Sequence, residues 1–292
     1  MRWTDDLIAV DWGTTNRRAF RLTRGERGQS LSDECGLLAV PAGGFADAVA
    51  DIRRQLGDLP MLLAGMVGSD RGWREAPYVA CPAGAAELAA AIAWIDPRTG
   101  IVPGVCQSDS GGADVMRGEE VQLVGALSSG LAPATGLVCH PGTHAKWILA
   151  EDGRIVRFRT MMTGELFGLL REHSILAPMI GGEPEPDERF AAGVAQMLAG
   201  EPLLSALFRI RARSLVERGA PPGASMASGL LIGSDVAGAL AGFPDLPVTL
   251  VGRPDLCALY ARALELAGRE SRTVDGDAAF LAGIACLART LS

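Results

Sequence analysis

The chain has 292 residues, 48% of them apolar, and its 27 basic and 34 acidic side chains give a formal net charge of −7. This length predicts about two domains with a sizeable core, and the apolar fraction excludes a disordered chain. The mild acidity excludes a typical nucleic-acid binder, and no run approaches the roughly 20 uninterrupted apolar residues of a membrane span. With no signal-peptide core behind its charged start, the sequence predicts a cytoplasmic protein.

The first half of the chain shows strand patterns followed by alternating helix and strand patterns. They predict strands at 7–10, 18–22 and 30–35, a helix at 45–56, a strand at 61–64, a helix at 85–94, a strand at 101–102, and a helix from Asp114 to about Leu127. The Gly/Pro-rich segment 130–134 is the best candidate for a linker, so we place the domains at 1–132 and 133–292.

The second half repeats the same order. Strands are predicted at 137–139, 146–149 and 155–158, a helix from about 164, a strand at 248–251, a helix at 255–266, a strand at 273–274 and a helix at 277–287. The stretch 187–218 has helical spacing but no counterpart in the first half, so it is interpreted as a helical insertion. The chain is therefore predicted to contain two related α/β domains.

The repeat is visible in the residues when the chain is shifted by 129 positions. Gly13-Thr14 then falls on Gly142-Thr143, each pair joins two predicted strands, and each copy ends in a cation, Arg17 or Lys146. A Gly-Thr turn lets backbone N–H groups approach an anion while the hydroxyl adds a donor. Two such turns could bind a polyphosphate, although each could also be only a tight hairpin.

Several segments together are similar to one known family. They are 9–22, 65–69, 72–78, 101–104, 114–120, 141–147, 162–167 and 171–176. The first contains Asp11-Trp12-Gly13-Thr14-Thr15, which resembles the first phosphate motif of the superfamily of sugar kinases, acetate kinase, actin and heat-shock chaperones. Within it, the combination most resembles the 2-dehydro-3-deoxygalactonokinase family.

This resemblance implies a fold and a reaction. The fold is α/β, with duplicated ribonuclease H-like (actin-like ATPase) domains and an interdomain cleft, the first domain on the substrate side and the second on the nucleotide side. The implied reaction is ATP- and Mg²⁺-dependent phosphorylation of the 6-hydroxyl of 2-dehydro-3-deoxy-D-galactonate, in galactonate catabolism. A kinase of another sugar acid, or a non-catalytic ATP-binding switch, is the alternative.

The resemblance also assigns roles to residues. The phosphates of ATP would contact the two turns, through residues Gly13, Thr14, Thr15, Arg17, Gly142, Thr143 and His144. Asp11, at a strand end, is the expected Mg²⁺ partner through water, unless it only caps the turn. Asp114 lies in an Asp-x-x-x-Gly-Glu pattern similar to that of the catalytic Asp of related sugar kinases, and we expect it to act as the general base. A helix N-cap is the structural alternative for Asp114, and Asp109 is the alternative base.

The sugar acid and the adenine need further contacts. Arg71 or Arg74 would bind the substrate carboxylate unless both are solvated charges. The other expected substrate contacts are Ser69, Trp73, Tyr78, Thr163 and Glu165, although Glu165 could instead serve its helix dipole. For adenine, the strand–turn–helix at Gly252 and Arg253 forms one expected wall and the segment around Gly229 the other.

Lys146 is the only lysine among the 27 basic residues. It is expected to act on phosphate or substrate, although an Arg bias of the chain alone could explain why lysine is so rare. The expected partners are a small sugar acid and, as an open alternative, a second copy of the chain in a homodimer, with no nucleic acid or membrane.

Overall fold

The structure is a computed structural model that describes residues 3, 6–109, 112–217 and 223–291. The chain divides into two compact units: unit 1 contains residues 1–135, 150–158 and 276–292, and unit 2 contains 136–149 and 159–275. Unit 1 therefore contains residues 150–158 and the last helix in addition to the N-terminal segment.

Unit 1 contains a six-stranded sheet in the order β3-β2-β1-β4-β7-β6. Its strands are β1 (Leu7–Trp12), β2 (Arg17–Thr23), β3 (Glu26–Asp33), β4 (Met61–Gly65), β6 (Ala93–Asp96) and β7 (Thr99–Ile101). The strands β1, β2 and β3 pair antiparallel, whereas β1, β4 and β7 run parallel. The carboxyl ends of β1 and β4 therefore meet at one edge, where ligands bind in open α/β sheets.

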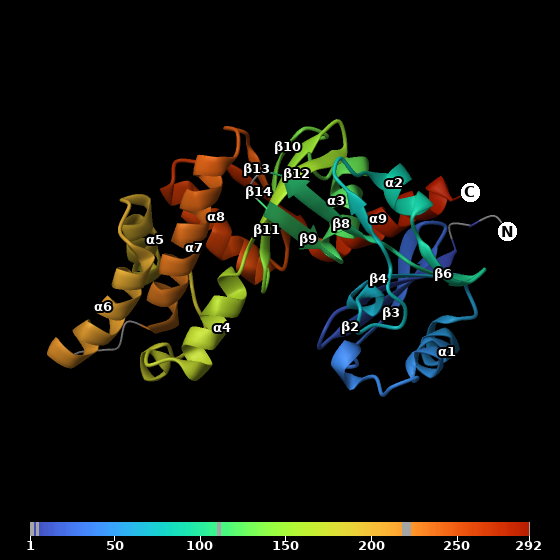
Figure 1. The fold of residues 1–292 in the computed structure, drawn as a ribbon, viewed down its shortest axis with the longest axis horizontal. Coiled ribbons are helices and arrows are strands. Elements are labelled where there is room, and N and C mark those ends of the chain that lie inside the picture. The colour runs from blue at the N-terminus through green and yellow to red at the C-terminus, as the bar shows by residue number, and fades with distance from the viewer. Residues whose placement is uncertain (1–2, 4–5, 110–111, 218–222, 292) are drawn as a thin grey trace. The chain divides into compact units, whose positions relative to one another are not determined.

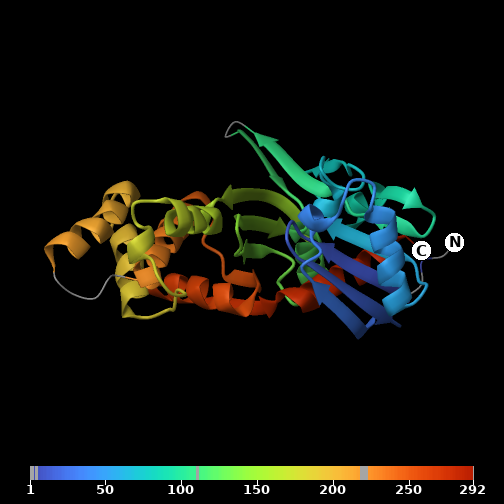
Figure 2. The same ribbon diagram turned by 90° about the horizontal axis from the view of Figure 1, so that it is seen from below.

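Helix α1 (Phe45–Leu56) has the bounds that the apolar spacing predicts. Its buried face, which includes Val49 and Ile52, packs into the core cluster that contains the β1 side chains Val10 and Trp12. Figure 2 shows α1, in blue, lying along the sheet of β1 to β3. This packing fixes the position of the β1 end.

Two predicted helices of unit 1 are wrong in extent. The Ala-rich helix predicted at 85–94 ends early, as α2 (Ala85–Ala90), because the segment of Trp94 pairs as β6 with β7. No helix begins at Asp114, since that residue lies in β9 (Gly112–Met116), opposite Gln107 in β8 (Gly104–Asp109). With β5 (Tyr78–Ala80) these strands form a second, three-stranded sheet.

Helix α3 (Glu119–Ser128) begins only after Gly118, whose φ of +107° is not helical. It packs against the last helix, α9 (Gly276–Thr290), and the two run side by side in Figure 1. A Cβ at Gly125 would lie 1.8 Å from the Ala279 oxygen, and one at Gly283 would lie 2.0 Å from the Val121 oxygen. Glycine at these two positions lets the backbones touch, which holds the last helix in unit 1.

The five-stranded sheet, whose strands β10, β13 and β14 belong to unit 2, repeats the order of the six-stranded sheet as β12-β11-β10-β13-β14. Its strands are β10 (Gly136–His140), β11 (Ala145–Glu151), β12 (Arg154–Met161), β13 (Val248–Gly252) and β14 (Ser271–Asp275). This order matches β3-β2-β1-β4-β7, so the duplication predicted from the sequence is confirmed.

The helices of unit 2 are α4 (Thr163–His173), α5 (Glu188–Leu198), α6 (Leu203–Val216), α7 (Gly223–Gly242) and α8 (Pro254–Leu266). The predicted insertion corresponds to α5 and α6, and its predicted last residue, Arg218, lies outside the described residues. Helix α7 was not predicted. It is long and apolar enough to span a membrane by length and composition, but 72% of its most apolar window is buried inside the protein, as in a core helix.

Candidate functional site

The first Gly-Thr turn joins β1 to β2 and is held from one side. The carbonyl oxygens of residues 13–15 accept hydrogen bonds from the N–H groups of residues 36–38 at 2.9 to 3.1 Å. In a trans peptide the N–H points opposite to the preceding carbonyl, so the N–H groups of residues 14–16 point away from this contact. The side chains of Thr14 and Thr15 are exposed. Such a run of N–H groups with two hydroxyls is suited to an anion.

The support behind this turn depends on a glycine. A Cβ at Gly36 would lie 2.3 Å from the carbonyl carbon of Thr15. Sequence reasoning missed this residue, although a glycine within the Cys35-Gly36-Leu37 segment is the signal that could have identified it.

Asp11 lies at the carboxyl end of β1 and is paired with Arg18. The other end of the Arg18 guanidinium donates to Asp277 Oδ1 at 2.6 Å, and Asp277 belongs to the first turn of α9. A Cβ at Gly65 would lie 3.6 Å from Asp11 Oδ1, so the β4 end is close as well. The sequence analysis missed Arg18 and Asp277, although Asp275-Gly276-Asp277 at a strand-to-helix junction was a usable signal.

The cation that ends the first turn does not face the turn. Arg17 is 5% exposed, donates to both carboxylate oxygens of Asp33 at 3.2 and 2.6 Å, and lies 5.0 Å from the ring centre of Trp12. Arg17 therefore forms an ion pair between neighbouring strands, and the phosphate contact predicted for it stays a prediction.

The second Gly-Thr turn, between β10 and β11, rests on the start of α4. The Thr143 carbonyl accepts from the Glu165 N–H at 2.9 Å, and a Cβ at Gly164 would lie 2.5 Å from the Gly142 oxygen. His144 Nε2 is hydrogen-bonded to the Glu165 carboxylate. Thus the N-terminus of α4 takes the place that residues 36–38 occupy behind the first turn.

Lys146 lies beneath this second turn and is only 3% exposed. Its ammonium donates to the carbonyl oxygen of His144 at 3.0 Å. Lys146 is therefore not a solvated surface charge. Its ammonium holds a carbonyl of the turn, and adds a positive charge close to it.

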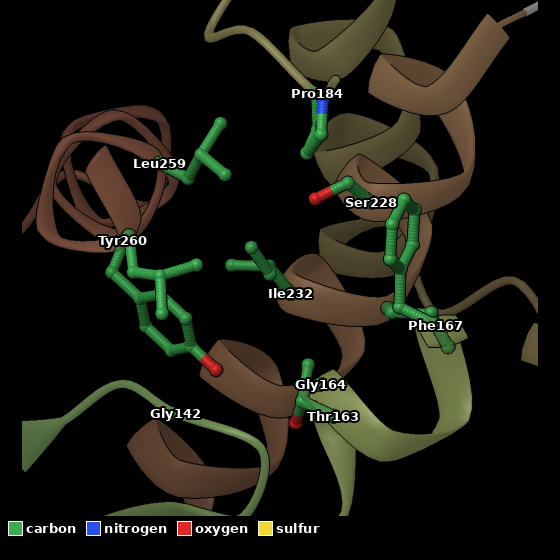
Figure 3. A pocket seen from close by; sticks show the side chains of 11 residues that line it. Gly142, Thr163, Gly164, Phe167, Pro184, Ser228, Ile232, Leu259 and Tyr260 are labelled. Atoms are coloured by element: carbon green, nitrogen blue, oxygen red, sulfur yellow. The ribbon is translucent and has the colours of Figure 1, made fainter. Parts of the chain in front are cut away.

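An open pocket of about 390 Å³ lies directly beside the second turn. Its walls are mostly apolar and come from α4, α7 and α8, as Figure 3 shows. The lining residues are Gly142, Thr163, Gly164, Phe167, Pro184, Ser228, Leu231, Ile232, Leu256, Leu259 and Tyr260. An apolar pocket with a few polar groups at one end is typical of a small-molecule site.

Beneath the pocket lies a buried carboxylate that the sequence analysis missed. Asp235 of α7 is 5% exposed and accepts from Trp147 Nε1, Thr163 Oγ1 and the Tyr260 hydroxyl at 2.5 to 2.6 Å. Burial raises the pKa of Asp235, and the three hydrogen bonds oppose that increase. No local motif marks this residue, because its partners lie 25 to 88 positions away in the chain.

Comparisons with known proteins identify the family. The family model described as 2-keto-3-deoxy-galactonokinase matches residues 11–287. The chain belongs to the 2-keto-3-deoxy-galactonokinase family. The 2-dehydro-3-deoxygalactonokinase of Escherichia coli (strain K12) is 36% identical over 297 residues, covering 99% of both chains.

One solved structure supports the same family and fold, and a second supports the fold alone. A candidate 2-dehydro-3-deoxygalactonokinase from Sinorhizobium meliloti has 36% identity and a TM-score of 0.90, covering 97% of this chain and 98% of that one. The activator of 2-hydroxyisocaproyl-CoA dehydratase from Clostridium difficile, with bound ADPNP, has 12% identity and a TM-score of 0.51, covering 98% and 94%. The predicted duplicated, ribonuclease H-like fold is confirmed.

In this member of the 2-keto-3-deoxy-galactonokinase family, most of the predicted substrate loop makes contacts within unit 1. The Ser69 hydroxyl donates to the Met66 carbonyl at 2.8 Å, and Trp73 stacks on Phe45. Arg74 donates to the Trp94 carbonyl at 2.6 Å. These contacts favour a structural role for the three side chains.

Two more residues of that loop differ in their surroundings. The Arg117 guanidinium lies 4.3 Å from the ring centre of Tyr78. Arg71 is exposed. Arg74 is exposed as well, but its guanidinium donates to the Trp94 carbonyl, so the choice between the two arginines for the substrate carboxylate stays a prediction.

The two candidate bases both lie on the β8–β9 hairpin. Asp109 pairs with Gly112 near the tip, and Asp114 lies two positions further along β9. The N-cap of α3 is Gly118, so capping does not account for Asp114. The residues that begin α3 are instead Glu119 and the buried Glu120, which the sequence analysis did not single out.

The predicted adenine contacts lie at the pocket only in part. A Cβ at Gly229 would lie 2.2 Å from the Phe190 oxygen, so this glycine serves the packing of α7 on α5, whereas its neighbour Ser228 lines the pocket. Gly252 lies beside Pro141 of the second turn. Arg253 is exposed, and its hydrogen bonds and charge lower the pKa of Asp255.

Proposed function

We propose that this protein is an ATP-dependent kinase that phosphorylates the 6-hydroxyl of 2-dehydro-3-deoxy-D-galactonate, giving 2-dehydro-3-deoxy-6-phosphogalactonate and ADP. Membership of the family supports the reaction. The observation that carries the proposal is the pocket next to Gly142, because it sets an apolar site against a turn suited to phosphate. A cytoplasmic location follows from the use of ATP.

The nucleotide contacts belong to two groups. Outward N–H groups and hydroxyls of the first turn, from Gly13 to Thr15, and of the second, from Gly142 to His144, would bind the β- and γ-phosphates. The apolar walls of α7 and α8 would hold the adenine, with Gly252 behind the second turn. We assign Thr163 and Glu165 to the nucleotide side, since they lie against the second turn.

Mg²⁺ is proposed to bind through Asp11. In the described residues no group of three or more His, Cys, Asp or Glu side chains could hold a metal ion. A single carboxylate still suits Mg²⁺, which keeps several waters and binds through one or two carboxylates together with phosphates. Asp11 fits, because its carboxylate is partly exposed at the end of β1, where Mg²⁺ would compete with its ion-pair partner Arg18. When bound, Mg²⁺ offsets phosphate charge.

The transfer itself needs a proton acceptor. We propose that the Asp114 carboxylate takes the proton of the substrate 6-hydroxyl. At the same time the substrate O6 bonds to the γ-phosphorus, and the bond from that phosphorus to the ADP oxygen breaks. Asp109, on the same hairpin, is the alternative. Arg71 would pair with the substrate carboxylate, and Lys146 would hold the second turn under the phosphates.

The test is an ADP-release assay with purified protein. The substrates are 2-dehydro-3-deoxy-D-galactonate, its C4 epimer, D-galactonate and pantothenate, and phosphorus NMR locates the new phosphate. We expect the first to be the best substrate and to be phosphorylated at O6. Turnover of ATP with none of the four would overturn the proposal.

Paired variants test the base. Asp114→Asn is expected to lower kcat by roughly 10²- to 10⁴-fold, the usual contribution of a general base. Asp109→Asn is the matched control on the same hairpin. If the loss follows Asp109 instead, that residue is the base, and near-normal kcat in both variants would refute a base on this hairpin.

A further inference from the structure

Asp235 joins four elements of unit 2 through one buried side chain. It lies on α7, and its three donors come from Trp147 on β11, Thr163 at the start of α4 and Tyr260 on α8. Two of these donors, Thr163 and Tyr260, also line the pocket. Figure 3 shows their side chains at the Gly142 end of the pocket, away from Pro184 and Leu259.

The chemistry of these groups fixes where the hydrogens point. A carboxylate only accepts, an indole N–H only donates, and a hydroxyl has one hydrogen to give. Thr163 Oγ1 and the Tyr260 hydroxyl both approach Asp235 Oδ2 at 2.5 Å, so both give their hydrogen to it. What remains on the two oxygens is lone pairs. This end of the pocket is therefore an edge of acceptors.

The same contact reaches the second turn. Thr163 is the first residue of α4, the next residue packs on the Gly142 oxygen, and Glu165 donates its N–H to the Thr143 carbonyl. A shift of Thr163 would therefore move the backbone that supports the turn. Asp235 therefore holds both the two acceptor hydroxyls and, through Thr163, the start of α4 that supports the second turn.

We propose that Asp235 is a positioning residue for the ribose of the nucleotide: it turns the Thr163 and Tyr260 hydroxyls into acceptors for the ribose 2′- and 3′-hydroxyls. This rests on the proposed function only in taking the pocket as the nucleoside site. Ribose connects the base to the phosphates, so with phosphate at the Gly142 turn and the base between the apolar walls, it meets this edge. Its hydroxyls are the donors that such an edge needs.

The decisive experiment measures binding of ADP, 2′-deoxy-ADP and 3′-deoxy-ADP by calorimetry, without the sugar acid. We expect the wild type to bind ADP about 3- to 10-fold more tightly than at least one deoxy analogue, the value of one hydrogen bond. In Asp235→Asn the amide can still accept from Trp147, but its NH₂ group would donate to the hydroxyls and turn their hydrogens elsewhere. The ratio of the affinity for ADP to the affinity for the deoxy analogues should fall towards one in this variant. KM for ATP should rise, while kcat at saturating ATP stays within about twofold.

Controls separate this from a general loss of stability. Tyr260→Phe removes one acceptor and should lower the same ratio while keeping the ring. Thr249→Val removes another buried hydroxyl of unit 2, on β13, which accepts from Arg272 at 3.2 Å, and should leave the ratio unchanged. Equal binding of ADP and both deoxy analogues to the wild type overturns the inference, whether or not Asp235→Asn folds. It leaves the kinase activity standing, whereas no binding of ADP at all contradicts both.

Discussion

A buried glutamate should make the stability of this protein fall as the pH rises. Glu120, in the first turn of α3, is 0% exposed, and its Oε2 accepts from the Gly118 N–H at 2.6 Å. Its Oε1 has no hydrogen-bond partner in the described part of the chain. Burial, and secondly the Glu119 carboxylate, raise the pKa of Glu120 from its ordinary 4.5 to about 8. The folded protein therefore holds a proton at pH 7 that the unfolded chain has released.

The size of the effect follows from that difference. At 1.36 kcal/mol per pH unit, the interval from 4.5 to about 8 corresponds to at most about 5 kcal/mol. The unfolded state binds fewer protons in this range, so the free energy of unfolding decreases as the pH rises through it and levels off above about 8. A loss of this order is a large part of the 5 to 15 kcal/mol that stabilises a typical domain.

The assay is urea denaturation of the wild type and Glu120→Gln at pH 5, 6.5, 8 and 9. The glutamine cannot ionise, so its stability relative to wild type should increase by several kcal/mol between pH 5 and 9. Glu188→Gln is the matched control, since Glu188 is also in the first turn of a helix, α5, but is exposed. Parallel pH profiles for wild type and Glu120→Gln would refute the reasoning.

Two further predictions concern the second turn. Lys146→Arg places a longer, planar group in a site with 3% exposure. The arginine should displace the His144 carbonyl and raise KM for ATP by roughly tenfold. Steady-state kinetics measure this KM, and an unchanged value would contradict the prediction. Gly164→Ala puts a methyl group 2.5 Å from the Gly142 oxygen and should weaken ADP binding in calorimetry. Gly168→Ala is the matched control on the same helix, because a Cβ there has nothing within 4 Å, and it should bind ADP normally. Equal ADP affinities of the two variants would rule out the proposed support of the turn.

The elements that sequence patterns predict well are those with strong local signals. The helix at Phe45–Leu56 has one apolar stripe, and the strands of both halves combine apolar runs with turn residues. The repeated strand order could therefore be predicted before any contact was known. Pairing between distant segments overrides local preference elsewhere: Ala-rich spacing predicts a helix through Trp94, but that segment pairs with β7.

The candidate site also has features that local sequence signals predict and features that depend on distant segments. The Gly-Thr turns could be predicted because their residues are contiguous. The pocket could not, since its walls come from segments between Gly142 and Tyr260 that no local motif links. Asp235 and Glu120 were missed for a related reason: what makes them unusual is burial, which depends on the packing of other elements around them.

The two cations show how far a duplication can be used to predict function. Arg17 and Lys146 occupy equivalent places in the repeat, yet Arg17 pairs with Asp33, its register partner on β3, while Lys146 donates into its own turn. Behind the first turn the backbone of residues 36–38 holds the carbonyls; behind the second, the N–H of Glu165 and the ammonium of Lys146 do so. Both arrangements have the same result, because a carbonyl fixed on one side directs the next N–H to the other. The repeat therefore preserves the direction of the backbone N–H groups, and the donors that enforce it differ between the two halves.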